Sequence, residues 1–384
     1  MNNLLRRGKT AVLYSEFDDL KPLANDPERV DPTLTLLCIV RNEMYFIPQF
    51  LRHYRSLGVT RFVAIDDCSD DGTREYLCRQ PDVVVLESSF RYGTLLNVPG
   101  DNEKVRACVV WRSLLAAKFA SDRWALQVDI DELLQLPAGW SLRDLVRFAD
   151  RQKDHALVGA MLDIYPRTVA DLKSEEVFDP AGEWYFDAVP HLVFDKPGMP
   201  AQVYNGSRSR FFAQYDLAPI GRRQTIRNFF GATKYRRTNQ LSKVFMLRWC
   251  DGARIVGAHE TTLPVCQDIL VPLLHFKFTS DLYRRTRYAL ESGGYYNASS
   301  EYHLMQNFLA QSDGGNGRLT CRYSKLVGQP DVFAQSGNML LQGVFQKGLR
   351  EIQAINANTG ISHSGQKQPH RHAEPDTGRY AQGF

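Results

Sequence analysis

The chain has 384 residues, of which 43% are hydrophobic, and its formal net charge is +4. This is enough apolar material for a full core in one large domain or two. A net charge this small argues against a nucleic-acid-binding protein. No stretch reaches the ~18 consecutive apolar residues that a membrane-spanning helix needs, although peripheral contact with a membrane surface stays open.

Seven cysteines are scattered along the chain, and no two have the Cys-x-x-Cys spacing of a zinc site. Their odd number and irregular spacing indicate reduced thiols. Arg6, Arg7 and Lys9 near the N-terminus are not followed by an apolar segment, so no signal peptide is expected. We therefore expect a protein of the cytoplasm or of the inner face of the membrane.

The first part of the chain alternates between two kinds of apolar pattern. After an N-terminal extension (1–30), short apolar runs predict strands and stretches with helical spacing predict helices. The expected order is strand 34–40, helix 47–57, strand 61–65, a short helix from Thr73, strand 83–86, helix 103–120 and strand 124–128. This alternation predicts an α/β fold, with a mainly parallel twisted sheet flanked by helices, over residues 31–140.

The pattern is weaker in the second half, which we assign to residues 141–325. Strands are expected at 156–164, 243–249 and 273–278, and helices at 142–148, 281–290 and 302–309. Residues 206–237 carry eight basic side chains against one acid, which indicates either an exposed loop or a surface for a diphosphate, an anionic acceptor or a phospholipid. A C-terminal region follows (326–384), and its polar composition predicts disorder from about residue 356.

Two acids follow the strand at 124–128, in the order Asp129, Ile130, Asp131. On an extended backbone, residues two apart point to the same face, so both carboxylates can reach one cation. Ligands of open α/β sheets bind beyond the carboxyl ends of the strands. Mg²⁺-type ions take one or two carboxylates together with phosphate oxygens. This pair is therefore a candidate metal site, with two solvated turn acids as the alternative.

Other acids end neighbouring strands. Asp66 and Asp67 follow the strand at 61–65, and Glu43 follows the first strand closely. An acid at a strand end can bind a base or a ribose, whereas the simpler interpretations are a turn and a favourable helix dipole. The sequence has neither Gly-x-Gly-x-x-Gly nor Gly-Lys-Ser/Thr, so a nucleotide would be held by acids and metal.

These motifs resemble those of GT-A glycosyltransferases of the family-2-like branch. The resemblance covers residues 34–136. It rests on Val-Arg-Asn-Glu at 40–43, His-Tyr-x-x-Leu-Gly-Val at 53–59, Asp-Asp-x-Ser-x-Asp-Gly-Thr at 66–73 and Trp-x-x-x-x-Asp-x-Asp-Glu-Leu at 124–133, in this order. It implies an inverting, metal-dependent transfer of a sugar from a nucleotide-sugar donor to a hydroxyl acceptor, such as a polysaccharide, a lipopolysaccharide or a glycolipid.

The resemblance also implies site residues. The expected donor-binding residues are Val40, Arg41, Asn42, Glu43, Asp66, Asp67 and Asp129. The expected ligands of Mn²⁺ or Mg²⁺ are Asp129 and Asp131, with His259 or His275 completing the shell. Such a metal would neutralise the departing diphosphate.

The acceptor hydroxyl also needs a general base within hydrogen-bond reach, and a carboxylate of the second half should supply it. Glu260 is the first candidate, with Asp187 and Asp163 as others. Two alternatives stay open. One is a haloacid-dehalogenase-like phosphatase with Asp129 as nucleophile, and the other is a catalytically silent protein that binds a sugar or a nucleotide.

Overall fold

Four runs of buried residues form the parallel part of a sheet in the computed structural model. They are β2 (Thr35–Val40), β3 (Arg61–Asp66), β4 (Val83–Glu87) and β7 (Trp124–Gln127). β2 pairs in parallel with β3 and β7, and β3 pairs in parallel with β4. Nearly every side chain in these strands is buried, as expected for strands covered on both faces.

The structure describes residues 16–341, except 100, 102, 152–153, 175–176, 189–190, 194–201, 205, 215–216, 218–240, 258, 294–295, 313–316, 330 and 337–338. These described residues belong to one compact unit, which contains both predicted halves. The predicted disorder beyond about residue 356 lies outside the described residues, as does most of the basic stretch 206–237.

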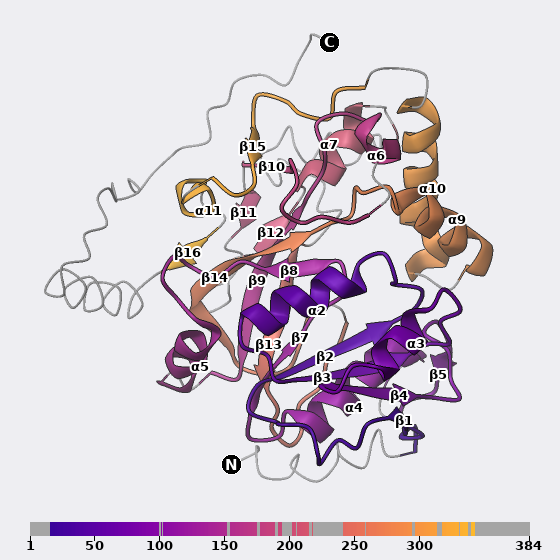
Figure 1. The fold of residues 1–384 in the computed structure, drawn as a ribbon, viewed down its shortest axis with the longest axis vertical. Helices are drawn as coiled ribbons and strands as arrows, with labels where there is room; N and C mark the ends of the chain where they lie inside the picture. Colours follow the sequence, from indigo (N-terminus) through magenta and orange to yellow (C-terminus); the bar gives the residue numbers. More distant parts are fainter. Residues whose placement is uncertain are drawn as a thin grey trace, which may run out of the picture. The chain divides into compact units, whose positions relative to one another are not determined.

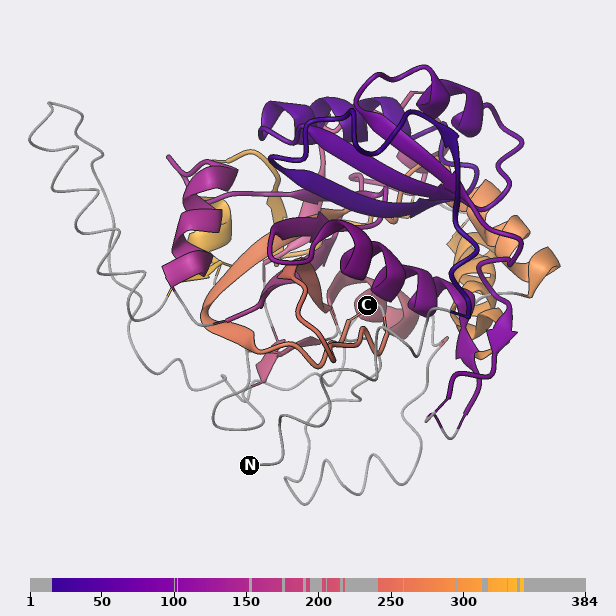
Figure 2. The same cartoon turned by 90° about the horizontal axis from the view of Figure 1, so that it is seen from below.

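Helices cover both faces of the parallel strands (Figure 2). The helix α4 (Ala107–Phe119) places Trp111 in one core cluster with Val63 of β3. The helix α2 (Ile47–Ser56) packs on the opposite face, where the rings of Phe50 and Phe62 lie 6.4 Å apart. Phe62 and Val63 are neighbours in an extended strand, so they point to opposite faces.

The second half continues the same sheet with mixed pairing (Figure 1). β13 (Ser242–Arg248) is antiparallel to both β7 and β9 (Ala156–Asp163), and β14 (Val265–His275) is parallel to β9. With β1 (Lys21–Ala24) and β16 (Leu340–Leu341) at its two edges, the full order is β1-β4-β3-β2-β7-β13-β9-β14-β16, and β8 (Glu132–Leu134) pairs with β14. The predicted α/β class, a large sheet flanked by helices, is confirmed.

The remaining described elements are short strands and helices. The strands are β5 (Leu95–Leu96), β6 (Val105–Arg106), β10 (Tyr185–Asp187), β11 (His191–Val193), β12 (Gln202–Tyr204) and β15 (Ser324–Leu326). The helices are α3 (Thr73–Cys78), α5 (Leu142–Arg151), α6 (Asp171–Ser174), α7 (Gly206–Gln214), α9 (Leu282–Ser292), α10 (Tyr296–Ser312) and α11 (Val332–Gln335).

Two details bear on the expectations from the sequence. The helix predicted over 103–120 begins only at Ala107, because residues 105–106 pair with Leu95–Leu96 as strands. None of the helices in the described part of the chain is long and apolar enough to cross a membrane.

Candidate active site

The predicted donor-binding residues lie at one edge of the sheet, where the parallel strands β2, β3 and β7 end. Val40 closes β2, and its carbonyl accepts a hydrogen bond from the Asp67 N–H at 2.9 Å. Val128, after β7, donates its N–H to the carbonyl of Leu37 at 3.3 Å, just before Asp129. The carboxyl ends of three neighbouring strands therefore meet here, as they do at ligand sites of open α/β sheets.

The Arg-Asn-Glu turn after β2 is fastened to the loop after β3. Asn42 has a left-handed backbone, with φ at 54°. Its side-chain amide donates to Asp70 Oδ1 at 2.7 Å and accepts from the Asp70 N–H at 2.9 Å. The Glu43 N–H donates to Thr73 Oγ1 at 2.8 Å. An Asn tolerates this backbone conformation because its short polar side chain bonds locally.

Asp66 and Asp67 have different surroundings. Asp66 is saturated, since Oδ2 accepts from Arg74 Nε at 2.7 Å and both oxygens face the Ser69 N–H. Asp67 is equally buried, but its Oδ1 has no hydrogen-bond partner among the described residues and lies 3.8 Å from an Arg91 nitrogen. Burial raises the pKa of the Asp67 carboxyl. The Asp67 carboxylate also accepts from the Tyr92 backbone N–H, so the unused acceptor in this pair of acids is the buried Oδ1 of Asp67.

Arg41 lies beside this acceptor. Its guanidinium donates to the carbonyl of Asp67 and stacks on the ring of Tyr288, 5.2 Å from the centroid. The Arg41 Nε is buried without a partner among the described residues. A buried donor and a buried acceptor without partners cost folding free energy. A polar ligand that paired with both groups would remove this cost.

Asp129 is held by two cations. Arg112 donates to its Oδ1 at 2.7 Å, and Lys243 donates to its Oδ2 at 2.6 Å. Lys243 also donates to both oxygens of Glu132 at 2.6–2.7 Å, and its side chain is only 1% exposed. Burial disfavours the charged form of Asp129, but the two cations outweigh it and lower its pKa. The Asp129 side chain is still 37% exposed, so one side of it faces outward.

Asp131 has separate partners. Its Oδ2 accepts from Arg285 at 2.7 Å and lies 3.4 Å from His275 Nε2. Its backbone carbonyl accepts from the Phe276 N–H at 2.8 Å. Asp129 thus contacts α4 and β13, while Asp131 contacts the end of β14 and α9.

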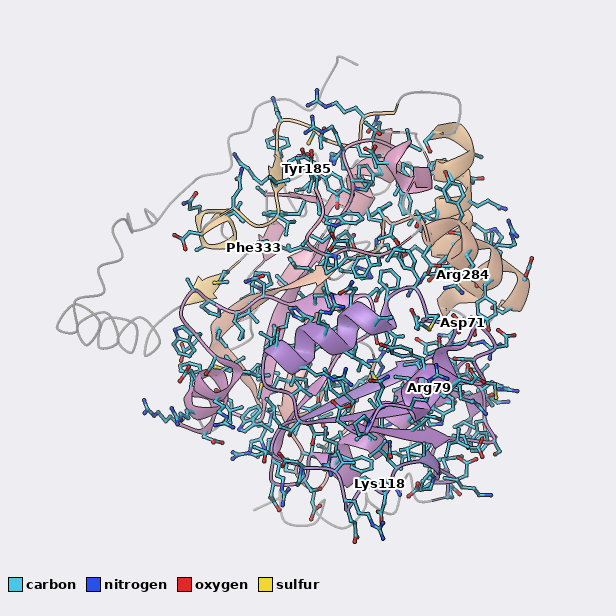
Figure 3. The ribbon with its side chains drawn as sticks, in the orientation of Figure 1. Asp71, Arg79, Lys118, Tyr185, Arg284 and Phe333 are labelled. Atoms are coloured by element: carbon cyan, nitrogen blue, oxygen red, sulfur yellow. The ribbon has the colours of Figure 1, made fainter. Side chains whose placement is uncertain are left out.

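Arg285 joins three carboxylates from distant parts of the chain. It donates to Glu43, to Asp131 and to Asp281, which precedes α9. Burial raises the pKa of Glu43 to about 8, although Arg285 opposes the shift. The neighbouring Arg284 donates to the carbonyl of Asn42 at 2.7 Å. Figure 3 labels Arg284 on α9 and Asp71 on the loop of β3 that faces it.

Sequence reasoning missed this contact between the two halves. The signal was present, because Asp281, Arg284 and Arg285 have the i, i+3 and i+4 spacing of ion pairs on a helix. Nothing in that spacing, however, points to Glu43 or Asp131 as further partners.

Asp163, a predicted base, lies in a buried charge chain. It accepts from Arg208 at 2.7 and 3.1 Å and lies 2.7 Å from His275 Nδ1. Burial opposes its ionisation, but Arg208 and His275 outweigh burial and lower its pKa. Burial also lowers the pKa of His275, but Asp131 and Asp163 outweigh it and raise this pKa to about 9. Both ring nitrogens of His275 therefore face carboxylates.

The other two predicted bases differ from each other. Asp187, on β10, accepts from the Tyr165 hydroxyl at 2.5 Å and from Arg210 at 2.8 and 3.0 Å. The Glu260 side chain is exposed, and the structure records no ion pair for it within the described residues. Asp187 is thus fully occupied, whereas Glu260 is open to solvent.

His259 has one occupied ring nitrogen. Its Nδ1 lies 3.0 Å from the carbonyl of Ser242, so Nδ1 carries the hydrogen and Nε2 keeps its lone pair. Metal-binding histidines are commonly oriented by such a backbone carbonyl. Burial and the charge of Lys243 lower the pKa of His259 to about 4, which also shows that it lies within the field of the Lys243 cluster.

A divalent ion could bind at this edge of the sheet only if the protein supplied few of its ligands. Within the described residues, no three His, Cys, Asp or Glu side chains are grouped to hold a metal by themselves. An ion held mainly by substrate phosphates needs only one or two protein ligands. Of the predicted ligands, Asp129 keeps an exposed side and the His259 ring keeps the lone pair of Nε2, so these two remain the candidates. His275 is not one of them, because both of its nitrogens already face acids.

Comparisons with known proteins point to solved structures alone. No family model and no curated protein sequence matches the chain. The chain is similar to Staphylococcus aureus TarS, with 15% identity over 73% of this chain and 42% of that chain and a TM-score of 0.28. It is also similar to the mannosyltransferase PcManGT from Pyrobaculum calidifontis in complex with GDP-Man and Mn²⁺, with 18% identity over 41% of this chain and 44% of that chain and a TM-score of 0.25. The chain spans less than half the length of either structure.

Proposed function

We propose that the protein is a glycosyltransferase that transfers a sugar from a nucleoside diphosphate-sugar to a hydroxyl acceptor. One observation carries this proposal. Asp67, whose buried Oδ1 has no hydrogen-bond partner among the described residues, and the outward-facing Asp129 lie at the ends of strands that both flank β2, at the edge where open α/β sheets bind ligands.

The two acids suit the two ends of a nucleoside diphosphate. Asp67 Oδ1 and Arg41 Nε, both without partners among the described residues, are an acceptor and a donor for a base or a ribose. Asp129 faces outward at the end of β7, which is two strands away from β3 in the sheet, and the diphosphate of the ligand would lie there. The saturated Asp66 supports the base end by fixing the loop through Ser69.

A bound Mn²⁺ or Mg²⁺ would be held by Asp129 and His259 together with phosphate oxygens. It would supply positive charge that stabilises the departing diphosphate. The tautomer of His259 and the orientation of Asp129 are set by the protein itself, through the carbonyl of Ser242 and through Arg112 and Lys243.

Glu260 is the proposed general base, because it is the predicted candidate without a competing cation in the described part of the chain. In the transfer, the acceptor oxygen forms a bond to the anomeric carbon while the carbon–phosphate oxygen bond breaks. The hydroxyl proton passes to the carboxylate of Glu260. This single displacement inverts the anomeric configuration. The acceptor is proposed to be a polysaccharide, a lipopolysaccharide or a glycolipid.

A donor screen tests the proposal. UDP-, GDP- and CMP-sugars are incubated with the protein and Mn²⁺ or Mg²⁺, and nucleotide release is measured with and without EDTA. Asp129→Asn should lower the release at least ~10²-fold, as expected for a group that acts on developing charge. Asp251→Asn changes an exposed acid on the turn after β13 and serves as the matched control. Absence of nucleotide release from every donor, with either metal, would contradict the proposal.

A further inference from the structure

Two buried cations share the carboxylate that the proposed function assigns to the metal. Arg112 and Lys243 each donate to one oxygen of Asp129, and their side chains are 6% and 1% exposed. They come from different elements, α4 and β13. Because both side chains are buried, neither cation can rotate into solvent and leave the Asp129 carboxylate.

The charges at this point balance. Two acids, Asp129 and Glu132, are matched by two cations, Arg112 and Lys243. The Glu132 carboxylate is additionally tied down, since it accepts from the Asp129 N–H at 2.9 Å. A divalent ion approaching the outward side of Asp129 therefore meets a carboxylate whose charge is already compensated.

The energetic consequence follows from Coulomb's law. A cation near Asp129 is attracted by the acids Asp129 and Glu132 and repelled by the basic groups Arg112 and Lys243, so the two contributions largely cancel. A bound diphosphate adds negative charge at this edge and restores the attraction. Because coupling between two ligands is reciprocal, the metal must then strengthen nucleotide binding by the same factor.

We propose, on the basis of the proposed function, that Lys243 and Arg112 neutralise Asp129 so that a divalent cation binds only together with a nucleoside diphosphate. The ion is thus recruited by the donor and is not resident in the empty protein. Lys243 and Arg112 act here as positioning residues that set both the orientation and the effective charge of Asp129.

Isothermal titration calorimetry of the full chain tests this proposal. Mn²⁺ alone, UDP alone, GDP alone and each nucleotide with Mn²⁺ are titrated in turn. We expect a dissociation constant for Mn²⁺ alone weaker than about 1 mM, and an affinity at least ~10-fold higher when the nucleotide is present. Tight binding of Mn²⁺ to the nucleotide-free wild type would overturn the inference, whereas failure of both nucleotides to bind would overturn the proposed function.

Variants assign the effect to the two cations. Arg112→Gln should raise the affinity for Mn²⁺ alone at least ~10-fold, because one compensating charge is removed. Lys243→Met should do the same. Adding Glu132→Gln to it removes one acid as well as one cation, so this double variant should bind Mn²⁺ alone as weakly as wild type. Lys118→Met is the control, since Lys118 lies on the same helix as Arg112 but forms a surface ion pair with Asp18 (Figure 3). Unchanged Mn²⁺ affinity in Arg112→Gln and in Lys243→Met would refute the role of these cations.

Discussion

Arg285→Met should destabilise the protein by about 3 kcal/mol. Arg285 donates to three carboxylates whose side chains are 17%, 8% and 4% exposed, those of Glu43, Asp131 and Asp281. Asp281 keeps Arg284 and Asp131 keeps His275 after the substitution. The main loss is the hydrogen bond from the charged Arg285 guanidinium to Glu43, with a contribution from its stacking on the Phe46 ring, 4.7 Å from the centroid. Such bonds contribute about 1.5–3 kcal/mol and such stacking about 0.5–2 kcal/mol.

Urea unfolding at neutral pH measures this loss as a shift of the midpoint at constant slope. Arg287→Met, an exposed position on the same helix, should stay within about 0.5 kcal/mol of wild type. Adding Glu43→Gln to Arg285→Met should cost less than the sum of the two single changes, with a coupling of about 1–2 kcal/mol. A loss below about 1 kcal/mol, or additive single changes, would refute the reasoning.

Three further changes test other contacts. Asp67→Ala should weaken nucleotide binding at least ~10-fold in titrations, because Asp67 Oδ1 is the acceptor proposed for the base or ribose and has no hydrogen-bond partner among the described residues. Tyr54→Phe should cost about 1–3 kcal/mol in urea unfolding, since the hydroxyl donates to the Glu132 carbonyl and accepts from the Leu134 N–H. Glu301→Gln should destabilise by about 1–2 kcal/mol at neutral pH after discounting for its 34% exposure. Burial opposes ionisation of Glu301, but its cationic neighbours outweigh burial and lower its pKa to about 2. Its contribution is therefore complete above the ordinary pKa of 4.5 and is lost as the pH falls through about 2, so equal pH profiles for variant and wild type would count against it.

The sequence predicted the elements whose side chains repeat regularly. The apolar runs of β2, β3, β4 and β7 are visible in the sequence because each strand is buried on both faces. The position of Asp66, Asp67 and Asp129 at one edge followed from the same pattern, since parallel strands end on the same side. Local periodicity in the sequence is therefore sufficient to predict the strands of the first half and the residues at their carboxyl ends.

The local sequence pattern could not predict the partners of these acids. Lys243 lies 114 residues after Asp129 in the sequence, and Arg285 lies 242 residues after Glu43. These pairs depend on how β13 and α9 return to the first half, and no local pattern specifies that return. For the same reason, the sequence could not distinguish His259 from His275, whose difference lies in the groups that face their ring nitrogens.

The short strand β8 has a consequence for how the protein can be divided. It follows the Asp129–Asp131 turn directly, yet it pairs with the end of β14, where Glu132 and Asp163 both stand opposite His275. A fragment that stopped at residue 140 would retain every motif of the first half but would leave β8 without its neighbour strand. The acids after β7 would then lose the strand pairing that orients their backbone. The segment that carries the recognisable motifs therefore depends for its conformation on a later part of the chain that carries no such motif.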